Sequence, residues 1–201
     1  MNRVRVAVLC SGGGTNLQAI LDSAAAGAIP SGEIALVVSD SAQAFALERA
    51  KKAGVKTFVA DKKQYPDRRE REQRILAALE EAGIGLVVLA GFMTILSEAF
   101  TKKFEMRMIN VHPSLIPSFC GPGFYGLKVH EAALGRGVKV TGATVHCGNE
   151  VGDGGPIIGQ KAVEVQEGDT PEVLQKRVMR EAEWIILPRA VETVCKQLLK
   201  D

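Results

Sequence analysis

The first ninety residues alternate between two hydrophobic periodicities, and this alternation limits the possible folds more than any other feature of the sequence. Short apolar runs typical of strands are each followed by a segment in which apolar residues recur at helical spacing. Glycine ends each helical segment, as it commonly does at a helix C-terminus. The expected strands are 4–9, 34–38, 56–59 and 86–90, and the expected helices lie between 15 and 27, 41 and 54, and 66 and 82, with Pro66 at a first helical position.

Strands that alternate with helices require right-handed crossovers, so the chain is expected to form an α/β fold. We predict an open, mostly parallel twisted sheet with helices on both faces. The second half departs from this pattern, and its strands, 107–111, 138–146 and 157–165, are expected to be partly antiparallel. A proline- and glycine-rich stretch follows the first of these strands. A helix is expected over 129–134, and a last helix begins at Thr170, with Pro188 expected to kink or break it.

Composition narrows the functional classes. The chain has 201 residues, a net charge of +2 and 24% charged residues, which is ordinary for a globular protein. It lacks a basic cluster, so nucleic-acid binding is not expected. The longest apolar run, 84–93, is far shorter than the roughly 20 residues that span a bilayer, and no signal peptide is visible. We therefore expect a cytoplasmic protein without a membrane partner.

Three glycines precede the first helix in the segment Ser11 to Asn16. Glycine lets the backbone approach a ligand closely, and free N–H groups at a helix start bind anions. A P-loop would need Lys-Ser/Thr here, and a dinucleotide fingerprint would need glycine or alanine at Leu17. We expect this segment to hold a phosphate, although a merely tight turn would give the same pattern.

The sequence Asn110-Val111-His112-Pro113 ends a predicted strand. Because side chains alternate along a strand, Asn110 and His112 are expected on one side, with Val111 in the core. Ligands of open α/β sheets bind at the carboxyl ends of strands. Asp153, in a glycine-rich loop, is a candidate carboxylate for the imidazole, although Asp-Gly is equally typical of a simple turn. The other two histidines carry less weight, and no spacing suggests a metal site.

Four segments together resemble one known family. They are Ser11-Gly-Gly-Gly-Thr-Asn-Leu-Gln-Ala-Ile, Leu89-Ala-Gly-Phe-Met, Ile109-Asn-Val-His-Pro-Ser-Leu-Ile-Pro and Asp153-Gly-Gly-Pro-Ile-Ile. In this order they are similar to the folate-dependent phosphoribosylglycinamide formyltransferases of purine synthesis. The resemblance implies transfer of a formyl group from 10-formyltetrahydrofolate, as co-substrate, to the amino group of glycinamide ribonucleotide, without a metal.

The resemblance also implies roles for particular residues. Asn110, His112 and Asp153 would be catalytic, and Gly14, Thr15 and Asn16, with Gly13 beside them, would hold the phosphate. Glu183 matches a glutamate that binds the ribose hydroxyls. The residues expected to contact the folate are Arg68, Phe92, Met93, Thr94, Ile95 and Leu96. The chain would then be one domain, 1–201, with a phosphate-binding half (1–100) and a catalytic and folate-binding half (101–201).

Three features depart from the family pattern and affect the folate end. Thr94 stands where many members have arginine, Asn149 stands where aspartate is common, and the stretch 118–128 is longer than in compact members. The expected partners are the two small-molecule substrates, and a homodimer is left open.

Three alternatives remain at this stage. Formyltetrahydrofolate hydrolysis uses water in place of the amine. A nucleotide-binding oxidoreductase would need an NAD site that Leu17 disfavours, and a sugar-phosphate sensor would not need Asn110 and His112 on one face. A separate alternative concerns the mechanism of the transfer itself: if a thiol were the nucleophile, it would have to be that of Cys120.

Overall fold

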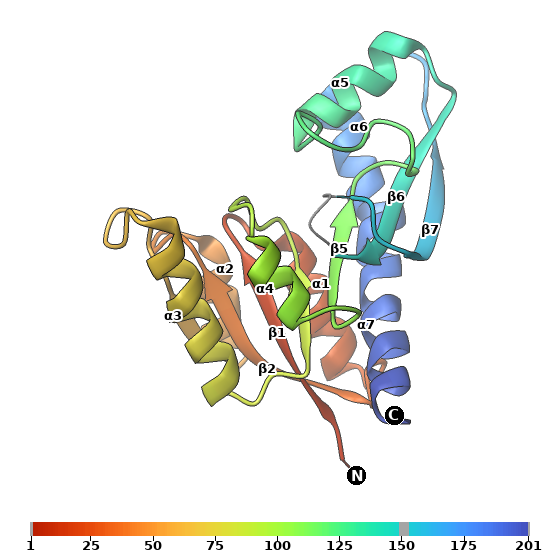
Figure 1. The fold of residues 1–201 in the computed structure, drawn as a ribbon. Helices are drawn as coiled ribbons and strands as arrows, with labels where there is room; N and C mark the ends of the chain where they lie inside the picture. The colour runs from red at the N-terminus through yellow and green to blue at the C-terminus, as the bar shows by residue number, and fades with distance from the viewer. Residues whose placement is uncertain (1, 149–152, 201) are drawn as a thin grey trace.

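The computed structural model describes residues 2–148 and 153–200, and its centre is one twisted seven-stranded sheet (Figure 1). Asn149 therefore lies outside the described residues. The strands are β1 (Val4–Cys10), β2 (Gly32–Ser39), β3 (Lys56–Val59), β4 (Leu86–Leu89), β5 (Met108–His112), β6 (Val140–Cys147) and β7 (Ile157–Glu164). The helices are α1 (Thr15–Ala25), α2 (Phe45–Lys52), α3 (Arg68–Glu81), α4 (Glu98–Lys103), α5 (Leu127–Arg136), α6 (Pro171–Val178) and α7 (Trp184–Leu198), with a π-helical turn, η1 (Met179–Glu183), between the last two.

The strand order is β3-β2-β1-β4-β5-β6-β7. All pairs from β3 to β5 are parallel, whereas β5–β6 and β6–β7 are antiparallel. The prediction of a mostly parallel sheet with partly antiparallel later strands is confirmed. Because β1, β4 and β5 run in the same direction, the segments that follow them emerge at one edge of the sheet.

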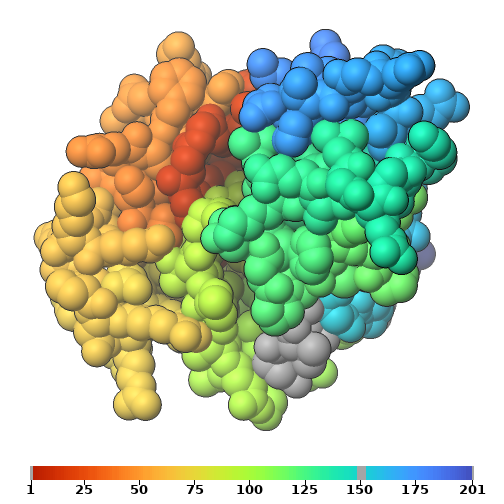
Figure 2. All heavy atoms as spheres, turned by 90° about the horizontal axis from the view of Figure 1, so that it is seen from above, coloured from red at the N-terminus to blue at the C-terminus, as the bar shows by residue number. Residues whose placement is uncertain are grey.

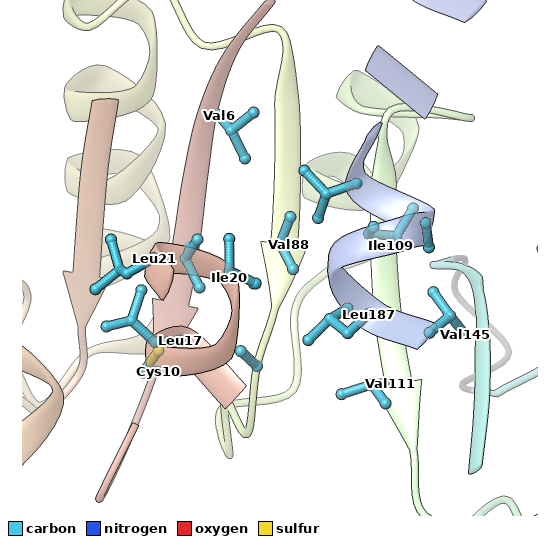
Figure 3. Packing of buried hydrophobic residues seen from close by; sticks show 14 of the residues in the cluster. Val6, Cys10, Leu17, Ile20, Leu21, Val88, Ile109, Val111, Val145 and Leu187 are labelled. Atoms are coloured by element: carbon cyan, nitrogen blue, oxygen red, sulfur yellow. The ribbon is translucent and has the colours of Figure 1, made fainter. Parts of the chain in front are cut away.

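Both faces of the sheet are covered by helices (Figure 1). Alternate residues of β1 serve the two faces: Val6 and Val8 join a core cluster beneath α1, α2, α6 and α7, whereas Ala7 and Leu9 join a second cluster beneath α3 and α4. Figure 3 shows the first cluster, in which Leu187 of α7 packs beside strand residues. A strand buried on both faces must be apolar throughout, which explains the continuous apolar runs.

Two helix starts differ from the prediction. Helix α2 begins at Phe45 and not at Ser41, because the backbone N–H of Ala42 is held by the carboxylate of Asp61 in a preceding turn. Helix α3 begins at Arg68, and its N-cap Asp67 accepts a hydrogen bond from the backbone N–H of Glu70. The prediction that Pro66 occupies a first helical position is therefore wrong, because Pro66 precedes the cap.

The end of the chain also differs. Pro188 lies inside α7, which continues to Leu198, so the predicted break at Pro188 is wrong. The interruption is instead the π-helical turn η1, which ends at Glu183, five positions before the proline. The six-residue helix α4 was not predicted. Among the residues that the structure describes, no helix has both the length and the hydropathy to cross a bilayer.

Candidate active site

The antiparallel pair β5–β6 has one polar face. Asn110 lies opposite His146, and His112 lies opposite Thr144. Directly opposite residues of an antiparallel pair share a face, so these four side chains project to the same side. The alternate residue Val111 is in the core cluster on the other side. The structure thus places Asn110 and His112 together, on the face that the alternation predicts.

Asp153 reaches this polar face from the loop before β7. Its Oδ2 lies 3.4 Å from Nδ1 of His112 and accepts a hydrogen bond from the backbone N–H of Gly121 at 3.0 Å. Its Oδ1 lies 3.4 Å from Nε2 of His146 and 3.4 Å from Nδ2 of Asn110. The three residues expected to be catalytic are therefore brought together, with a second histidine among them.

The carboxyl group of Asp153 is held in its charged form. Burial raises its pKa, but the neighbouring imidazole of His146, the hydrogen bond from the backbone N–H of Gly121 and the neighbouring imidazole of His112 lower it and outweigh burial. The net effect is a pKa below the usual range of an aspartate. Asp153 is therefore a carboxylate at neutral pH.

Sequence reasoning gave His146 little weight, yet the histidine completes the cluster. Its Nδ1 donates to the backbone carbonyl of Cys147 at 2.9 Å, because a carbonyl oxygen can only accept. In the neutral ring, Nε2 then accepts from Nδ2 of Asn110, at 3.2 Å. This contact turns the amide nitrogen of Asn110 toward the site. A usable signal existed, since Thr144-Val145-His146 repeats the polar-valine-histidine pattern of 110–112.

The irregular stretch after β5 is fixed by the same polar face. The hydroxyl of Thr144 donates to the carbonyl of Ser114 at 2.7 Å and accepts from the backbone N–H of Ile116 at 3.1 Å. Further along, the carbonyl of Phe119 accepts from Nε2 of His112 at 2.8 Å. Both ring nitrogens of His112 are therefore engaged, one with Asp153 and one with the loop.

The glycine turn leads into α1. Gly14 has φ +68°, and it precedes the helix without a side-chain cap. Asn16 is buried and donates from Nδ2 to Oε2 of Glu183 at 2.6 Å, whereas its Oδ1 has no partner in the described part of the chain. Burial raises the pKa of Glu183, against the hydrogen bond from Asn16, which lowers it. The structure therefore joins two residues, 16 and 183, that were both expected at the substrate.

The segment 91–97 follows β4 at the same edge of the sheet. The backbone N–H of Ser11 donates to the carbonyl of Gly91 at 3.1 Å, and the hydroxyl of Ser11 accepts from the backbone N–H of Met93 at 2.8 Å. Met93 and Ile95 are 55% and 79% exposed, which is unusual for apolar side chains. Figure 2 shows the surface hollowed where this yellow-green segment meets the red turn and the green loop after β5.

Asp40 ties this segment to the turn. It is only 2% exposed, and its Oδ2 accepts from the hydroxyl of Thr94 at 2.5 Å and lies 2.8 Å from Nζ of Lys62. Burial raises the pKa of Asp40, but the hydrogen bonds from Lys62, Thr94 and Ser11 lower it by more. The net pKa is therefore below the usual range of an aspartate. Thr94, which departs from the family pattern, is thus held in place by a hydrogen bond to a buried carboxylate.

The folate candidate Arg68 is the first residue of α3 and pairs with a glutamate that contacts the end of the segment 91–97. Its Nε is 3.0 Å from Oε1 of Glu72, which also accepts from the backbone N–H of Ser97 at 2.9 Å. The remaining candidates, Phe92 and Leu96, are half-buried against the second core cluster. The described residues contain no group of three or more His, Cys, Asp or Glu side chains that could hold a metal ion.

Comparison with known proteins gives consistent matches. A family model described as formyl transferase matches residues 4–191. The chain is 38% identical over 188 residues to the phosphoribosylglycinamide formyltransferase of Haemophilus influenzae, covering 94% of this chain and 85% of that protein. The glycinamide ribonucleotide transformylase 1 of Symbiobacterium toebii has a solved structure that superimposes with a TM-score of 0.90 at 43% identity, over 97% of this chain and 89% of that one.

A further relative is much longer than this chain. The trifunctional purine biosynthetic protein adenosine-3 of Gallus gallus is 47% identical over 193 residues, which is 96% of this chain. The match spans only 18% of the Gallus gallus protein.

Proposed function

The chain belongs to the formyl transferase family, as an enzyme of the phosphoribosylglycinamide formyltransferase type, and we propose that it formylates the amino group of glycinamide ribonucleotide in purine biosynthesis. The proposed donor is 10-formyltetrahydrofolate. One observation supports this assignment above the others: the carboxylate of Asp153 lies among Asn110, His112 and His146 at the carboxyl end of β5. The arrangement combines hydrogen-bond donors and a base at one point.

In the proposed reaction the substrate amine attacks the formyl carbon, and the formyl oxygen becomes negatively charged. The proposed donors for this oxygen are the amide of Asn110 and the imidazole of His112, whose Nε2–H would exchange the carbonyl of Phe119 for the oxyanion. Donors fixed before the reaction stabilise such an oxyanion, and loss of one typically costs about 10²–10³-fold in kcat. His146 supports this role because its Nε2 accepts from the nitrogen of Asn110 and so excludes the flipped amide.

Asp153 has two proposed tasks. It orients the ring of His112, and it takes part in moving a proton from the attacking amine to the leaving nitrogen of the donor, through water. A carboxylate that stays charged at neutral pH suits both tasks. The transfer breaks one carbon–nitrogen bond, forms another and moves one proton, so it needs no redox partner.

The two ends of the site fit the two substrates. Gly13, Gly14, Thr15 and Asn16 are proposed to bind the phosphate, and Glu183, beside Asn16, the ribose hydroxyls. On the other side, Met93 and Ile95 offer exposed apolar surface for a flat heteroaromatic ring. Phe92, Thr94 and Leu96, the loop around Asp153 and Arg68 would complete the folate side.

These assignments divide the chain as the sequence suggests. We propose a single domain in which residues 1–100 bind the phosphate and residues 101–201 supply the catalytic groups and much of the folate site. We also propose a cytoplasmic location.

A spectroscopic assay of formyl transfer tests the proposal directly. The donor is supplied with and without glycinamide ribonucleotide, and its loss is followed. The proposed function predicts turnover only when the ribonucleotide is present. Equal turnover without it would instead identify a formyltetrahydrofolate hydrolase.

A further inference from the structure

Helix α2 holds the carbonyl groups of the glycine turn. The backbone N–H of Ala46 donates to the carbonyl of Gly12 at 3.1 Å, and Nε of Arg49 donates to the carbonyl of Gly13 at 2.8 Å. Gly14 packs so closely that a Cβ there would lie 2.7 Å from Cβ of Ala46. Two carbonyl oxygens, which would repel an anion, therefore accept hydrogen bonds from residues of α2. The N–H groups at the start of α1 stay available to a ligand.

Arg49 is fixed on three sides. Besides the bond to Gly13, its Nη1 donates to Oε1 of Gln18 at 3.0 Å, and its guanidinium lies 5.0 Å from the ring centroid of Phe45. Among the described residues, no carboxylate lies within ion-pair distance of Arg49, and the first turn of α1 contains no acidic residue. An uncompensated positive charge is thus held beside a helix N-terminus, where both favour an anion.

A pocket of about 340 Å³ opens beside this charge. Thr15, Gln18 and Arg49 line it, and Trp184, which follows Glu183, forms another wall. One helical turn farther along α1, Asp22 accepts from Nε2 of Gln18 at 2.8 Å. The amide of Gln18 therefore presents its oxygen to Arg49 and its nitrogen to Asp22. The positive end of the pocket lies at the glycine turn, and the negative end lies away from it.

We propose that Arg49 is a positioning and specificity residue for the phosphate end of the substrate. It holds the glycine turn in its anion-binding form and supplies the charge that favours a doubly negative phosphate monoester. This inference rests on the proposed function and adds a residue to the phosphate site. Arginine suits the position because its planar fork reaches Gly13 and Gln18 at once, which a lysine ammonium cannot do with the same geometry.

Steady-state kinetics of two variants tests the role. Arg49→Met removes the charge and both hydrogen bonds, whereas Arg49→Lys keeps the charge and loses the fork. Arg74→Met is the matched control, because Arg74 also lies over an aromatic ring, 4.0 Å from the centroid of Tyr65, on the distant helix α3. We expect Arg49→Met to raise the KM for glycinamide ribonucleotide about 10- to 100-fold, with kcat and the KM for the donor within about twofold of wild type.

Arg49→Lys is expected to raise the same KM by a smaller factor, and Arg74→Met to leave all constants unchanged. If both Arg49 variants match the control, Arg49 has no such role. A melting temperature lowered without any change in KM would show that Arg49 only stabilises the fold. Should Arg49→Met fail to fold, Arg49→Lys decides alone, and a KM within twofold of wild type contradicts the proposal.

Trp184 gives a readout that does not depend on turnover. It is the chain's single tryptophan and lines the same pocket as Arg49. Its fluorescence is followed while ribose 5-phosphate is added in the absence of donor. We expect the half-saturating concentration to rise in Arg49→Met by the same factor as KM, and equal values in both proteins would contradict the role. Wild-type protein that binds ribose 5-phosphate but transfers no formyl group would refute the proposed function and leave the Arg49 assignment standing.

Discussion

Nε2 of His146 lies 3.4 Å from Oδ1 of Asp153, so a strand histidine and the carboxylate of the following loop meet beside Asn110. The same nitrogen is 3.2 Å from Nδ2 of Asn110. His146 therefore contacts two of the three proposed catalytic residues. Its proposed effect is to orient the amide, because its own Nδ1 is committed to the carbonyl of Cys147.

A double-mutant cycle tests this orientation. His146→Leu removes the acceptor, and we expect kcat to fall about tenfold, which corresponds to one lost hydrogen bond of roughly 1.4 kcal/mol. His146→Gln keeps an acceptor oxygen and should recover part of the loss. In a background of Asn110→Ala, which itself should lower kcat about 10²–10³-fold, His146→Leu should add little. Fully additive losses would mean that the two residues act independently.

Asp153→Asn separates charge from backbone geometry. Asp153 has φ +47°, a left-handed conformation that asparagine tolerates better than other residues do. The substitution therefore changes the charge with little effect on the loop. We expect kcat to fall about 10²-fold or more, because the amide can neither accept a proton nor orient the imidazole of His112 as a carboxylate does. An unchanged kcat would remove Asp153 from the mechanism.

Asp40→Ala tests the link between the glycine turn and the segment 91–97. The substitution removes the acceptor for Thr94 and the partner of Lys62. We expect the free energy of unfolding to fall by about 1–3 kcal/mol in a urea titration, and the KM for the folate donor to rise more than kcat falls. Asp61→Ala is a suitable control, since the carboxylate of Asp61 accepts from the backbone N–H groups of Ala42 and Lys63 and so stabilises turns, whereas Thr94 donates to Asp40. Equal donor KM values in the two variants would show that Asp40 does not organise the folate side.

His130 should make stability depend on pH. It is 1% exposed, and burial, followed by the charge of His112, lowers its pKa from 6.5 to about 4. Between these two values the unfolded chain binds a proton that the folded chain does not, so the free energy of unfolding falls as the pH drops from about 6.5 to about 4. The loss from this group approaches roughly 3 kcal/mol.

Urea unfolding of wild type and His130→Leu between pH 7 and pH 4 measures this contribution. The wild type should lose more stability than the variant over that window. Parallel pH profiles of the two proteins would show that His130 is not the titrating group.

Cys120 provides a test of the competing chemistry. Burial and the nearby charge of Asp153 both raise the pKa of its thiol, so little thiolate forms at neutral pH. Cys120→Ala should therefore retain full kcat in the formyl-transfer assay. A large loss, with formyl group trapped on the wild-type protein, would revive a thiol nucleophile.

The parallel part of the fold was predictable because its information is local. The apolar runs of β1 and β4 and the glycines that end the helices each mark one element, and the predicted strand 56–59 agrees with β3 at both ends. The start of α2 was not predictable in this way. Asp61, which holds the turn before α2, is distant in sequence, so helical periodicity could not reveal it.

The site was predictable only in part, for the same reason. The shared face of Asn110 and His112 follows from alternation within one strand. The contact of His146 with Asn110 depends on the register between β5 and β6, which no single strand encodes. The grip of Arg49 on Gly13 likewise joins residues that are 36 positions apart.

The bond between Asn16 and Glu183 has a consequence for biosynthesis, because the two residues are 167 positions apart. At a translation rate of about 5–20 residues per second, roughly 8–30 seconds separate their synthesis. A nascent chain therefore contains the glycine turn long before the partner of Asn16 is made. Until then the amide of Asn16 must be satisfied by water, so the proposed ribonucleotide site is complete only after residue 183 has been synthesised.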